Sequence, residues 1–461
     1  MTLPESASGT RPRRGQAAAA ILGAAALATL SAAPAVAATA THQLAGNTRF
    51  AFHQPDPAAL QQVGSLLAHH DARDAALIAG ELLTPQADWF TKGTPAEVRQ
   101  QVARIVVRDN ALRTVPVLVI YNVPGRDCSQ YSSGGAVSDS AYRAWIDGFV
   151  QGLGSGKAVV VVEPDGLANL PSDCPAAYPG QDIAALTAGR IADIRYAGES
   201  VESHDPNAVV YLDAGNSAWH SVGDIADRLT QAGVNDVQGL ALNVSNYQYT
   251  ANSDFYGTWV ADCLAYTTTI SPGAFGDCPN QYWNGGPPNN WNGVELNRYG
   301  VWSETASDPA LNTAGITSRY TTMLGGLVPT AHFVVDSSRN GKGPNDMNAY
   351  AAAPYNQPAA VVHGLQNGNW CNPPGAGLGV KPTASTGVPL ADAYLWVKTV
   401  GESDGQCNIA GGARAWDYGA YNPWGWNAAQ QAANDPLWGI LDPAAGAWFP
   451  QQALQLAQNA S

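Results

Sequence analysis

Two runs of β-branched residues, each followed by a carboxylate, constrain the fold of this chain more than any other feature. The first run begins at Val115 and leads to Asp127, and the second covers residues 158–163 and leads to Asp165. An amphipathic helical pattern lies between them, so residues 114–165 are predicted to form a βαβ unit. Because this connection makes the two strands parallel, both aspartates are expected at the same edge of one sheet.

Strand-like and helix-like segments alternate along most of the chain. Strands are predicted at residues 49–53, 115–123, 158–163, 208–213, 239–244, 332–336 and 393–398, with a weaker one around Ala76, and helices at 95–112, 140–153, 182–203 and 222–232. This alternation predicts a parallel α/β barrel or an open doubly wound sheet. Nearly every predicted strand is followed by a polar residue. A closed ring would gather these residues at one mouth, so we favour the barrel.

The N-terminus has the composition of a secretory signal peptide. Residues 1–37 contain three arginines, then an apolar run rich in Ala, Leu and Ile, then Ala35-Val36-Ala37, which predicts cleavage before Ala38. The alternative is a membrane anchor, but the high alanine content and the cleavage pattern favour a signal peptide. We therefore expect residues 38–461 to form a single domain of a secreted protein. No later run is apolar enough to span a bilayer.

Cysteine content and charge narrow the function further. The six cysteines of an exported chain predict three disulfides, and none forms a CxxC pair, so neither a zinc site nor a redox dithiol is predicted. The formal net charge of −14 and the lack of a basic patch exclude nucleic acid and anionic lipid as expected partners. An acidic chain with 14 tryptophans suits a neutral polar ligand, because indole faces stack on the C–H faces of sugar rings.

Other short motifs fail on inspection. The Gly154-Ser-Gly156-Lys157 stretch lacks the first glycine and the final Ser or Thr of a phosphate-binding loop. His69 and His70 have no further ligand at metal spacing and are expected to be solvated. No Gly-x-Ser-x-Gly elbow is present. The remaining group of candidate catalytic residues is acidic.

Paired carboxyl groups are the requirement for glycoside hydrolysis, in which one is protonated and the other ionised. Asp165 follows a strand with a buried character, and a neighbouring Asp127 would raise its pKa by like-charge repulsion. For any one aspartate the alternative is a helix cap or an ion pair. For Asp213 or Asp336 taken alone, the sequence favours a structural role and a catalytic role equally.

The sequence resembles glycoside hydrolase family 6, the cellulases that include cellobiohydrolases and endoglucanases acting on β-1,4-glucan. The matching motifs are Tyr121-Asn-Val-Pro-Gly-Arg126-Asp127-Cys128, Glu163-Pro-Asp165-Gly-Leu-Ala-Asn169, Asp213-Ala-Gly-Asn216-Ser-Ala-Trp219, Asn243-Val-Ser-Asn246-Tyr247, Asp336-Ser-Ser-Arg339, Trp370-Cys371-Asn372 and Lys398-Thr-Val-Gly-Glu402-Ser-Asp404. They occur in family order and cover essentially the whole chain after the signal peptide.

This resemblance implies a distorted seven-stranded parallel β/α barrel with long loops over the C-terminal strand ends. It also implies hydrolysis with inversion of the anomeric centre. By position, Asp165 is similar to the general acid. Asp127 is similar to the partner that keeps the acid protonated and draws a proton from water through a relay, and Asp404 to the carboxylate proposed as a direct base.

Further positions carry over from the resemblance as substrate-binding residues: Tyr121, Arg126, Ser133, Asp213, Trp219, Asn246, Trp370, Lys398 and Glu402. Ser133 corresponds to the relay serine, with Ser132 as the alternative. Trp219 and Trp370 correspond to sugar-stacking platforms, for which core packing is the alternative. Asn216 departs from the histidine of many relatives. The resemblance also implies disulfides Cys128–Cys174 and Cys371–Cys407, which leaves Cys263 and Cys278 for each other.

Two stretches, residues 250–314 and 406–445, exceed the compact endoglucanase pattern. Long insertions without secondary structure are usually functional loops, and in family 6 a loop at the second position roofs the site. We therefore favour a cellobiohydrolase that releases cellobiose. The alternatives are an open-cleft endo-β-1,4-glucanase, with both insertions folded away from the site, and a catalytically silent glucan-binding protein.

The expected partners are β-1,4-glucan chains, namely cellulose and cello-oligosaccharides, with no nucleic acid and no membrane. No metal or organic cofactor is expected, because acid/base chemistry on an acetal requires neither. No separate carbohydrate-binding module or Pro/Thr/Ser tether is visible. We expect a secreted, extracellular monomer.

Overall fold

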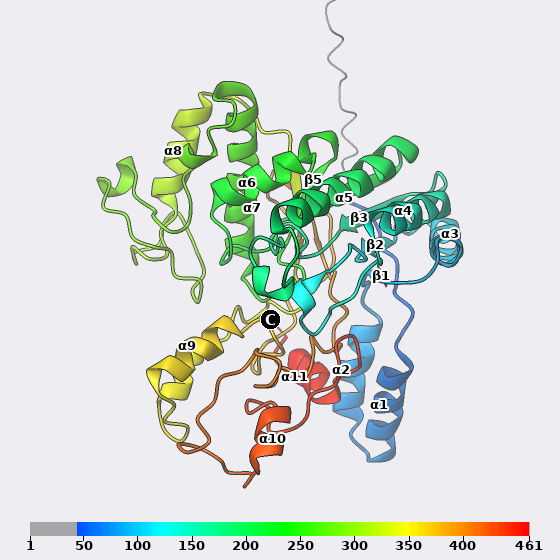
Figure 1. Ribbon diagram of the computed structural model, residues 1–461, viewed down its shortest axis with the longest axis vertical. Helices are drawn as coiled ribbons and strands as arrows, with labels where there is room; N and C mark the ends of the chain where they lie inside the picture. The colour runs from blue at the N-terminus through cyan, green and yellow to red at the C-terminus, as the bar shows by residue number, and fades with distance from the viewer. Residues whose placement is uncertain (1–43, 461) are drawn as a thin grey trace, which may run out of the picture. The chain divides into compact units, whose positions relative to one another are not determined.

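A sheet of seven parallel strands in chain order organises the computed structural model, which describes residues 44–460 (Figure 1). The predicted signal peptide, residues 1–37, lies outside the described residues. The strands are β1 (Asp88–Phe90), β2 (Val117–Ile120), β3 (Ala158–Val162), β4 (Ala208–Asp213), β5 (Gly239–Leu242), β6 (His332–Asp336) and β7 (Ala391–Leu395). Each strand pairs only with its sequence neighbours, which confirms the predicted seven-stranded parallel β/α barrel.

The barrel is distorted at the junction between its first and last strands. Within residues 44–460 no ladder joins β7 to β1. Instead, the Ala87 N–H donates to the Trp396 carbonyl at 3.0 Å, and the Trp89 indole N–H donates to the Val397 carbonyl at 2.8 Å. The sheet is therefore a curled half-barrel whose two edge strands are held together at one end.

Helices cover the outside of the sheet and extend the chain beyond it. They are α1 (Pro57–Ala68), α2 (Ala72–Leu82), α3 (Pro95–Ala111), α4 (Asp139–Leu153), α5 (Ile183–His204), α6 (Val222–Gln231), α7 (Thr250–Ala265), α8 (Ala314–Leu324), α9 (Ala359–Asn367), α10 (Ala428–Ala433) and α11 (Pro450–Gln458). Figure 1 shows α1, α2 and α11, from opposite ends of the chain, packed side by side. No described helix is long and apolar enough to cross a membrane.

Alternating residues of the strands build two apolar layers. Val119, Val161 and Tyr211 belong to a cluster inside the curl of the sheet. Their neighbours, among them Val160 and Leu212, belong to the larger cluster that the surrounding helices cover. Because successive side chains of a strand point to opposite faces, both faces of each strand are buried, and the strands are almost uniformly apolar. Polar side chains that could face a ligand are consequently confined to the strand ends.

Close packing of α4 on α3 depends on small residues in and just after α4. A Cβ added at Gly148 would lie 2.3 Å from the Pro95 carbonyl oxygen, and one added at Gly152 would lie 2.7 Å from the Arg99 carbonyl oxygen. The two helices therefore touch through their backbones. This contact holds the βαβ unit that carries Asp127 and Asp165.

Several predicted elements differ from the structure. The segment around Ala76 is not a strand but lies in α2, because Asp71 caps a run of good helix formers at its N-terminus. Residues 49–53 form only an isolated bridge, from Phe50 to Val115. The true first strand, β1, was missed because three residues are too short for a periodic signal. The insertion predicted at 250–314 begins as helix α7 and is only partly a loop.

The three disulfides confirm the predicted pairing. Cys128 bonds Cys174, Cys371 bonds Cys407, and Cys263 bonds Cys278. The first two tie loops that follow β2 and β7 to segments near the carboxyl ends of neighbouring strands. The third lies in the insertion after β5 and closes its first loop onto α7.

Candidate active site

A cavity of about 730 Å³ opens where the carboxyl ends of the strands meet. All the predicted site residues except Asp213 line it, namely Tyr121, Arg126, Asp127, Ser133, Asp165, Trp219, Asn246, Trp370, Lys398, Glu402 and Asp404. They come from the loops that follow β2 to β7, so residues almost 300 positions apart face the same space. The parallel sheet brings them together because all its strands end on the same side.

Asp127 and Asp165 both line the cavity, and the pKa of each is raised. Burial, and then the charges of Asp127 and Asp404, together raise the pKa of Asp165 to about 7. Burial also raises the pKa of Asp127 to about 6, although the Ser132 N–H, 2.6 Å from its Oδ2, and the Arg126 guanidinium favour the anion. Like-charge repulsion was predicted as the cause for Asp165, but desolvation is the larger one.

Both serines considered for the proton relay line the cavity beside Asp127. Ser132 contacts the Asp127 carboxylate through its backbone N–H, and its carbonyl accepts a hydrogen bond from the Arg126 Nε at 2.8 Å. Ser133 is exposed. The loop thus fixes the position of the carboxylate and places the exposed Ser133 in the cavity wall.

Asp213 lies behind the cavity wall and anchors the backbone. Its Oδ1 accepts hydrogen bonds from the N–H groups of Asp165 at 2.9 Å and Gly215 at 3.0 Å, and the side chain is buried. Burial, and then the charge of Asp165, raise the pKa of Asp213 well above its usual range. Asp213 therefore holds Asp165 in place from behind and does not line the space where a ligand would bind.

Asp336, at the end of β6, is also a structural residue. Its two carboxylate oxygens accept hydrogen bonds from the backbone N–H groups of Ser245, Ser338, Val397 and Lys398. These groups belong to the loops after β5, β6 and β7. One buried carboxylate thus joins three loops that carry cavity residues.

Asp404 lies in a basic environment, unlike Asp165. Its Oδ2 accepts hydrogen bonds from the Arg339 guanidinium at 2.9 Å, the Asn372 N–H at 3.0 Å and the Tyr247 hydroxyl at 3.1 Å, and Lys398 Nζ lies 3.5 Å from its Oδ1. Burial alone would raise the pKa of Asp404, but Arg339 and Lys398 outweigh it and hold the pKa below its usual range. Asp404 is therefore ionised at neutral pH.

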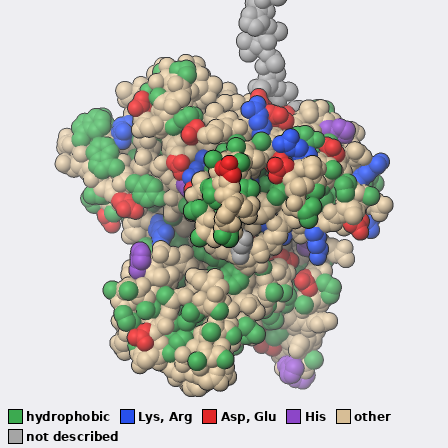
Figure 2. Space-filling model, in the orientation of Figure 1, with side chains coloured by type: hydrophobic (Ala, Val, Ile, Leu, Met, Phe, Trp, Pro, Cys, Tyr) green, Lys and Arg blue, Asp and Glu red, His purple; other side chains and the backbone are tan. Residues whose placement is uncertain are grey.

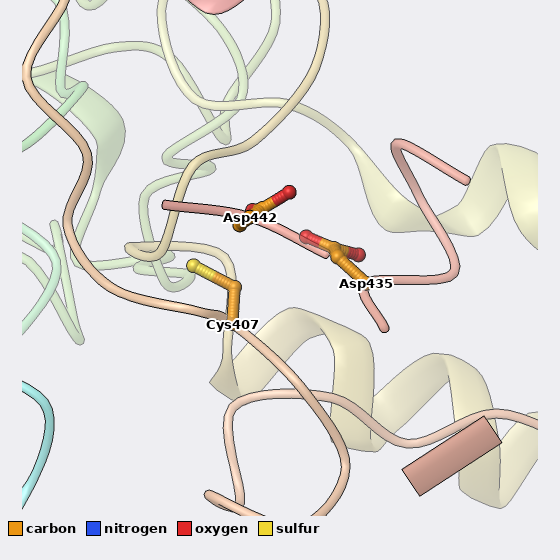
Figure 3. Close-up of side chains that lie close together, drawn as sticks. All are labelled: Cys407, Asp435 and Asp442. Carbon is orange, nitrogen blue, oxygen red and sulfur yellow. The ribbon is translucent and has the colours of Figure 1, made fainter. Parts of the chain in front are cut away.

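A second buried acidic group consists of Asp435 and Asp442, which lie close to Cys407 (Figure 3). It connects to Asp404 through Asn372. The Asn372 Nδ2 donates to Asp442 at 3.0 Å, while the Asn372 backbone N–H donates to Asp404. Burial and the charge of Asp435 raise the pKa of Asp442 to about 8. Asp435 itself forms a two-pronged ion pair with Arg414, at 2.9 and 3.1 Å.

This group resembles a metal site only in its composition. Cys407, Asp435 and Asp442 are the one cluster of potential metal ligands found within residues 44–460. The sulfur of Cys407 is bonded to Cys371, so it is no thiolate, and Arg414 already occupies the Asp435 carboxylate. These residues do not fit a cation, and the cluster is better described as an acid pair that shares a proton.

Aromatic side chains line the walls on either side of the carboxyl groups. Trp219 is partly exposed and stacks on His220, with ring centroids 5.6 Å apart, and Trp370 packs at a tilt against Tyr131 at 6.3 Å. Tyr121 contacts the Arg126 guanidinium on its face at 4.6 Å. Partly exposed indoles that flank a row of polar groups suit a ligand with alternating apolar faces and hydroxyl edges.

Comparison with known proteins agrees with this geometry. The model of the glycosyl hydrolases family 6 matches residues 46–460. The chain belongs to glycosyl hydrolase family 6. The family 6 match covers the whole barrel, including the carboxyl groups and tryptophans described above.

The relatives of this chain within family 6 include proteins named as endoglucanases and proteins named as cellobiohydrolases. Endoglucanase A of Cellulomonas fimi is 32% identical over 388 residues, which cover 84% of this chain and 57% of that protein. A probable 1,4-beta-D-glucan cellobiohydrolase C of Aspergillus fumigatus is 30% identical over 363 residues, covering 75% of this chain and 61% of that protein. This chain thus spans somewhat more than half the length of these relatives.

A solved family 6 structure corresponds to nearly the whole of the described chain. The endoglucanase Cel6 of Mycobacterium tuberculosis, in complex with methyl-cellobiosyl-4-deoxy-4-thio-beta-D-cellobioside, is 30% identical, with a TM-score of 0.57. The match covers 91% of this chain and 99% of that chain. It agrees with the distorted barrel described here.

Three residues, one in the cavity wall and two buried behind it, were not singled out from the sequence as site residues. Trp89 lines the cavity and meets Tyr121 edge to face at 5.4 Å, but it lies on the unpredicted strand β1. Arg339 was only part of a motif, and its role became visible when β6 and β7 brought it to Asp404. Glu163 accepts two hydrogen bonds from the Asn122 N–H, at 2.9 and 3.1 Å, and so fixes the end of β2. Its position just before Asp165 was the one available signal.

Proposed function

We propose that this protein hydrolyses β-1,4-glucosidic bonds of cellulose with inversion, and that Asp165 is the general acid. The observation that supports this most directly is the contrast within one cavity between Asp165, whose pKa is raised to about 7, and Asp404, whose pKa is lowered. Glycoside hydrolysis needs one carboxyl group of each kind on either side of the scissile bond. The flanking tryptophans would hold the sugar rings.

Asp127 is the stronger candidate for the group that accepts the proton of the attacking water. With a pKa of about 6 it is a better proton acceptor than Asp404, whose oxygens are engaged by Arg339, Tyr247 and Lys398. The water that attacks the anomeric carbon would pass its proton to Asp127 through a second water and the hydroxyl of Ser132 or Ser133. Asp404 would then stabilise positive charge in the transition state.

Release of cellobiose from chain ends is the mode of action that we prefer. The insertion after β5 contributes Arg298 to the cavity wall, and the segment after β7 contributes Ala445 and Gly446, so loops from distant parts of the chain narrow the site. The names of several relatives, including the endoglucanases of Cellulomonas fimi and Mycobacterium tuberculosis, favour the second candidate, an endoglucanase with an open cleft.

Digestion of amorphous cellulose and of carboxymethylcellulose distinguishes these modes. Cellobiose as the main product, with little loss of viscosity, supports action at chain ends, whereas a rapid fall in viscosity with mixed oligosaccharides supports an endoglucanase. Proton NMR of the first product should show the α-anomer if the reaction inverts. No new reducing ends at all would favour a glucan-binding protein without catalysis.

We also infer that the protein acts outside the cytoplasm as a monomer. Three disulfides are typical of oxidising compartments. N-terminal sequencing of protein recovered from the culture medium should begin at Ala38, and sedimentation should give the mass of one chain. Retention of residues 1–37 on a membrane-bound product would support the anchor instead.

A further inference from the structure

The insertion between β5 and β6 carries a pair of exposed tryptophans outside the catalytic cavity. Trp283 is 41% exposed and Trp291 is 56% exposed, and their ring planes are 22° apart with centroids separated by 6.3 Å. Neither residue lines the catalytic cavity. Figure 2 shows hydrophobic side chains gathered over the loops beside α8, where this insertion lies. Exposed apolar patches of this kind usually mark an interaction site.

The two rings are held in fixed positions. The Arg319 guanidinium of α8 lies 5.2 Å from the Trp283 ring centroid and 6.0 Å from that of Trp291. Trp283 packs so closely on the backbone of Gly285 and Gly293 that a Cβ at either position would come within 2.5 Å of the indole. Binding would therefore order few side chains, which lowers its entropic cost.

The surrounding loop is equally well tied down. The Asn284 side chain donates to the carbonyls of Pro309 and Asn312, at 2.6 and 2.7 Å, and accepts from the Val294 N–H at 2.8 Å. Trp291 adopts a φ of 62°, a left-handed conformation that is unfavourable for a bulky residue. An exposed indole kept in such a conformation indicates a function at the surface.

The same loop also reaches the catalytic cavity. Tyr282, next to Trp283, donates its hydroxyl to the Trp219 carbonyl at 2.8 Å. A second cavity of about 510 Å³, lined by Tyr282, Tyr299 and Trp302, shares Ala218, Arg298 and Gln366 with the catalytic cavity. A polymer chain bound in the catalytic cavity could thus leave past Tyr282 toward the tryptophan pair.

We propose that Trp283 and Trp291 form a second binding site for a β-1,4-glucan chain, outside the catalytic cavity, which holds the polysaccharide near the site of cleavage. This inference rests on the proposed function. Indole faces stack on sugar rings, and the Arg319 guanidinium supplies donors for hydroxyl groups. An uncharged polysaccharide suits a chain of net charge −14. The Arg319 guanidinium, which contacts both tryptophans, lies against their rings.

The test compares adsorption to insoluble cellulose with turnover of a short soluble substrate. Trp283→Ala/Trp291→Ala should bind amorphous cellulose about ten- to hundredfold more weakly, because each of the two stacked rings contributes roughly a three- to tenfold gain. Turnover of cellotetraose should stay within about twofold of wild type, since this substrate is short enough for the catalytic cavity. Adsorption is measured in an Asp165→Asn background, so that the cellulose is not digested.

Two controls separate loss of the rings from loss of the fold. Trp291→Phe keeps an aromatic face and should retain most of the adsorption, and Phe52→Ala removes an aromatic side chain that is 52% exposed elsewhere. Unchanged adsorption of the double variant, or an equal loss of cellotetraose turnover, would overturn the second site. A wild-type protein that sediments as a dimer and a double variant that sediments as a monomer would also overturn the second site, because the rings would then form an interface between two copies.

Failure of the proposed function would look different. If the wild-type protein adsorbs to cellulose through this pair but releases no sugar from cellotetraose or cellulose, the second site stands and hydrolysis is excluded. If it hydrolyses both substrates while the double variant adsorbs normally, hydrolysis stands and the second site is excluded.

Discussion

The two sides of the catalytic cavity place the same chemical group in opposite charge states. Asp165, after β3, faces two other carboxylates and no cation within hydrogen-bonding distance among the described residues, and its pKa is raised. Asp404, after β7, contacts Arg339, Lys398 and Tyr247, and its pKa is lowered. Both side chains are largely removed from water. Burial alone therefore does not set the proton affinity of a carboxyl group, and the charges beside it decide the sign of the shift.

The largest expected effect comes from removing the proton donor. Asp165→Asn should lower kcat on unactivated glucan by about 10³-fold, because general acid catalysis contributes about 10²–10⁴. Binding of cello-oligosaccharides, measured by calorimetry, should change little. Asp236→Asn, at an exposed carboxylate that pairs weakly with Arg195, is the matched control and should be fully active. Normal turnover by Asp165→Asn would remove this residue from the role of acid.

The next largest effect is expected from removing Arg339, the cation beside Asp404. Arg339→Met should reduce the free energy of unfolding by about 3–5 kcal/mol, because it leaves the buried Asp404 carboxylate without its cation. Urea unfolding followed by tryptophan fluorescence measures this loss.

A compensating variant provides the control for Arg339→Met. Adding Asp404→Asn removes the unpaired charge and should restore part of the stability, although not the activity. A loss below about 1 kcal/mol in the single variant would mean that Asp404 is not held by Arg339 as described.

The pH dependence of kcat/KM sharpens the assignment of the base. Above pH 7 the rate should fall about tenfold per pH unit, because Asp165 loses its proton. With Asp127 as base, the rate should also fall below about pH 6, as that carboxylate becomes protonated. With Asp404 as base, the acid limb would lie below pH 4 instead, because its pKa is lowered. An acid limb below pH 4 would therefore contradict the relay through Asp127.

Stability should respond to pH through the same carboxyl group. The pKa of Asp165 is about 7 in the native state and near 3.8 when unfolded, so between these values the native state binds more protons. This group therefore makes the free energy of unfolding fall as the pH rises from about 4 to about 7. Asp165→Asn removes that loss and should raise the melting temperature at pH 8 but not at pH 4. An equal change at both pH values would show that Asp165 titrates normally.

The smallest effect concerns the acid pair behind Asp404. Asp442 has a pKa of about 8 and is protonated at neutral pH, so Asp442→Asn replaces a carboxylic acid by a group of similar shape and hydrogen bonding. Unfolding free energy at pH 6 should change by less than about 1 kcal/mol. At pH 9 the variant should be the more stable protein, since it lacks a second negative charge beside Asp435. Asp227→Asn, on α6, is the control at a carboxyl group outside this network.

The fold was largely predictable because its signals are local. The run that became β4 was predicted with the bounds that the structure has, Ala208–Asp213, since an apolar β-branched run followed by a polar loop needs no tertiary information. Strand β1 was not predictable in this way, because three residues carry no period. Trp89 was therefore missed together with its strand.

The residue types of the site were predictable from the sequence, but the role of each individual residue was not. Asp213 and Asp165 both follow apolar strands, and nothing in their local sequence separates them. In the folded chain Asp213 accepts the Asp165 N–H behind the wall, while Asp165 faces the cavity. Which way a strand-end side chain points depends on the loop after it and on the packing of neighbouring strands.

The sequence by itself determined the parallel barrel, the three disulfides and the set of carboxyl groups and tryptophans at the strand ends. The barrel and the presence of three disulfides follow from period and residue type, which are properties of short segments. The pairing of the cysteines and the roles of the tryptophans followed from the resemblance to family 6. Only the tertiary structure decided which carboxyl group carries a proton and which is ionised. The loops after the neighbouring strands β6 and β7 bring Arg339 and Lys398 to Asp404, whereas Asp165 lies among other acids. Electrostatic interactions act over a few ångströms of space, whatever the separation along the chain.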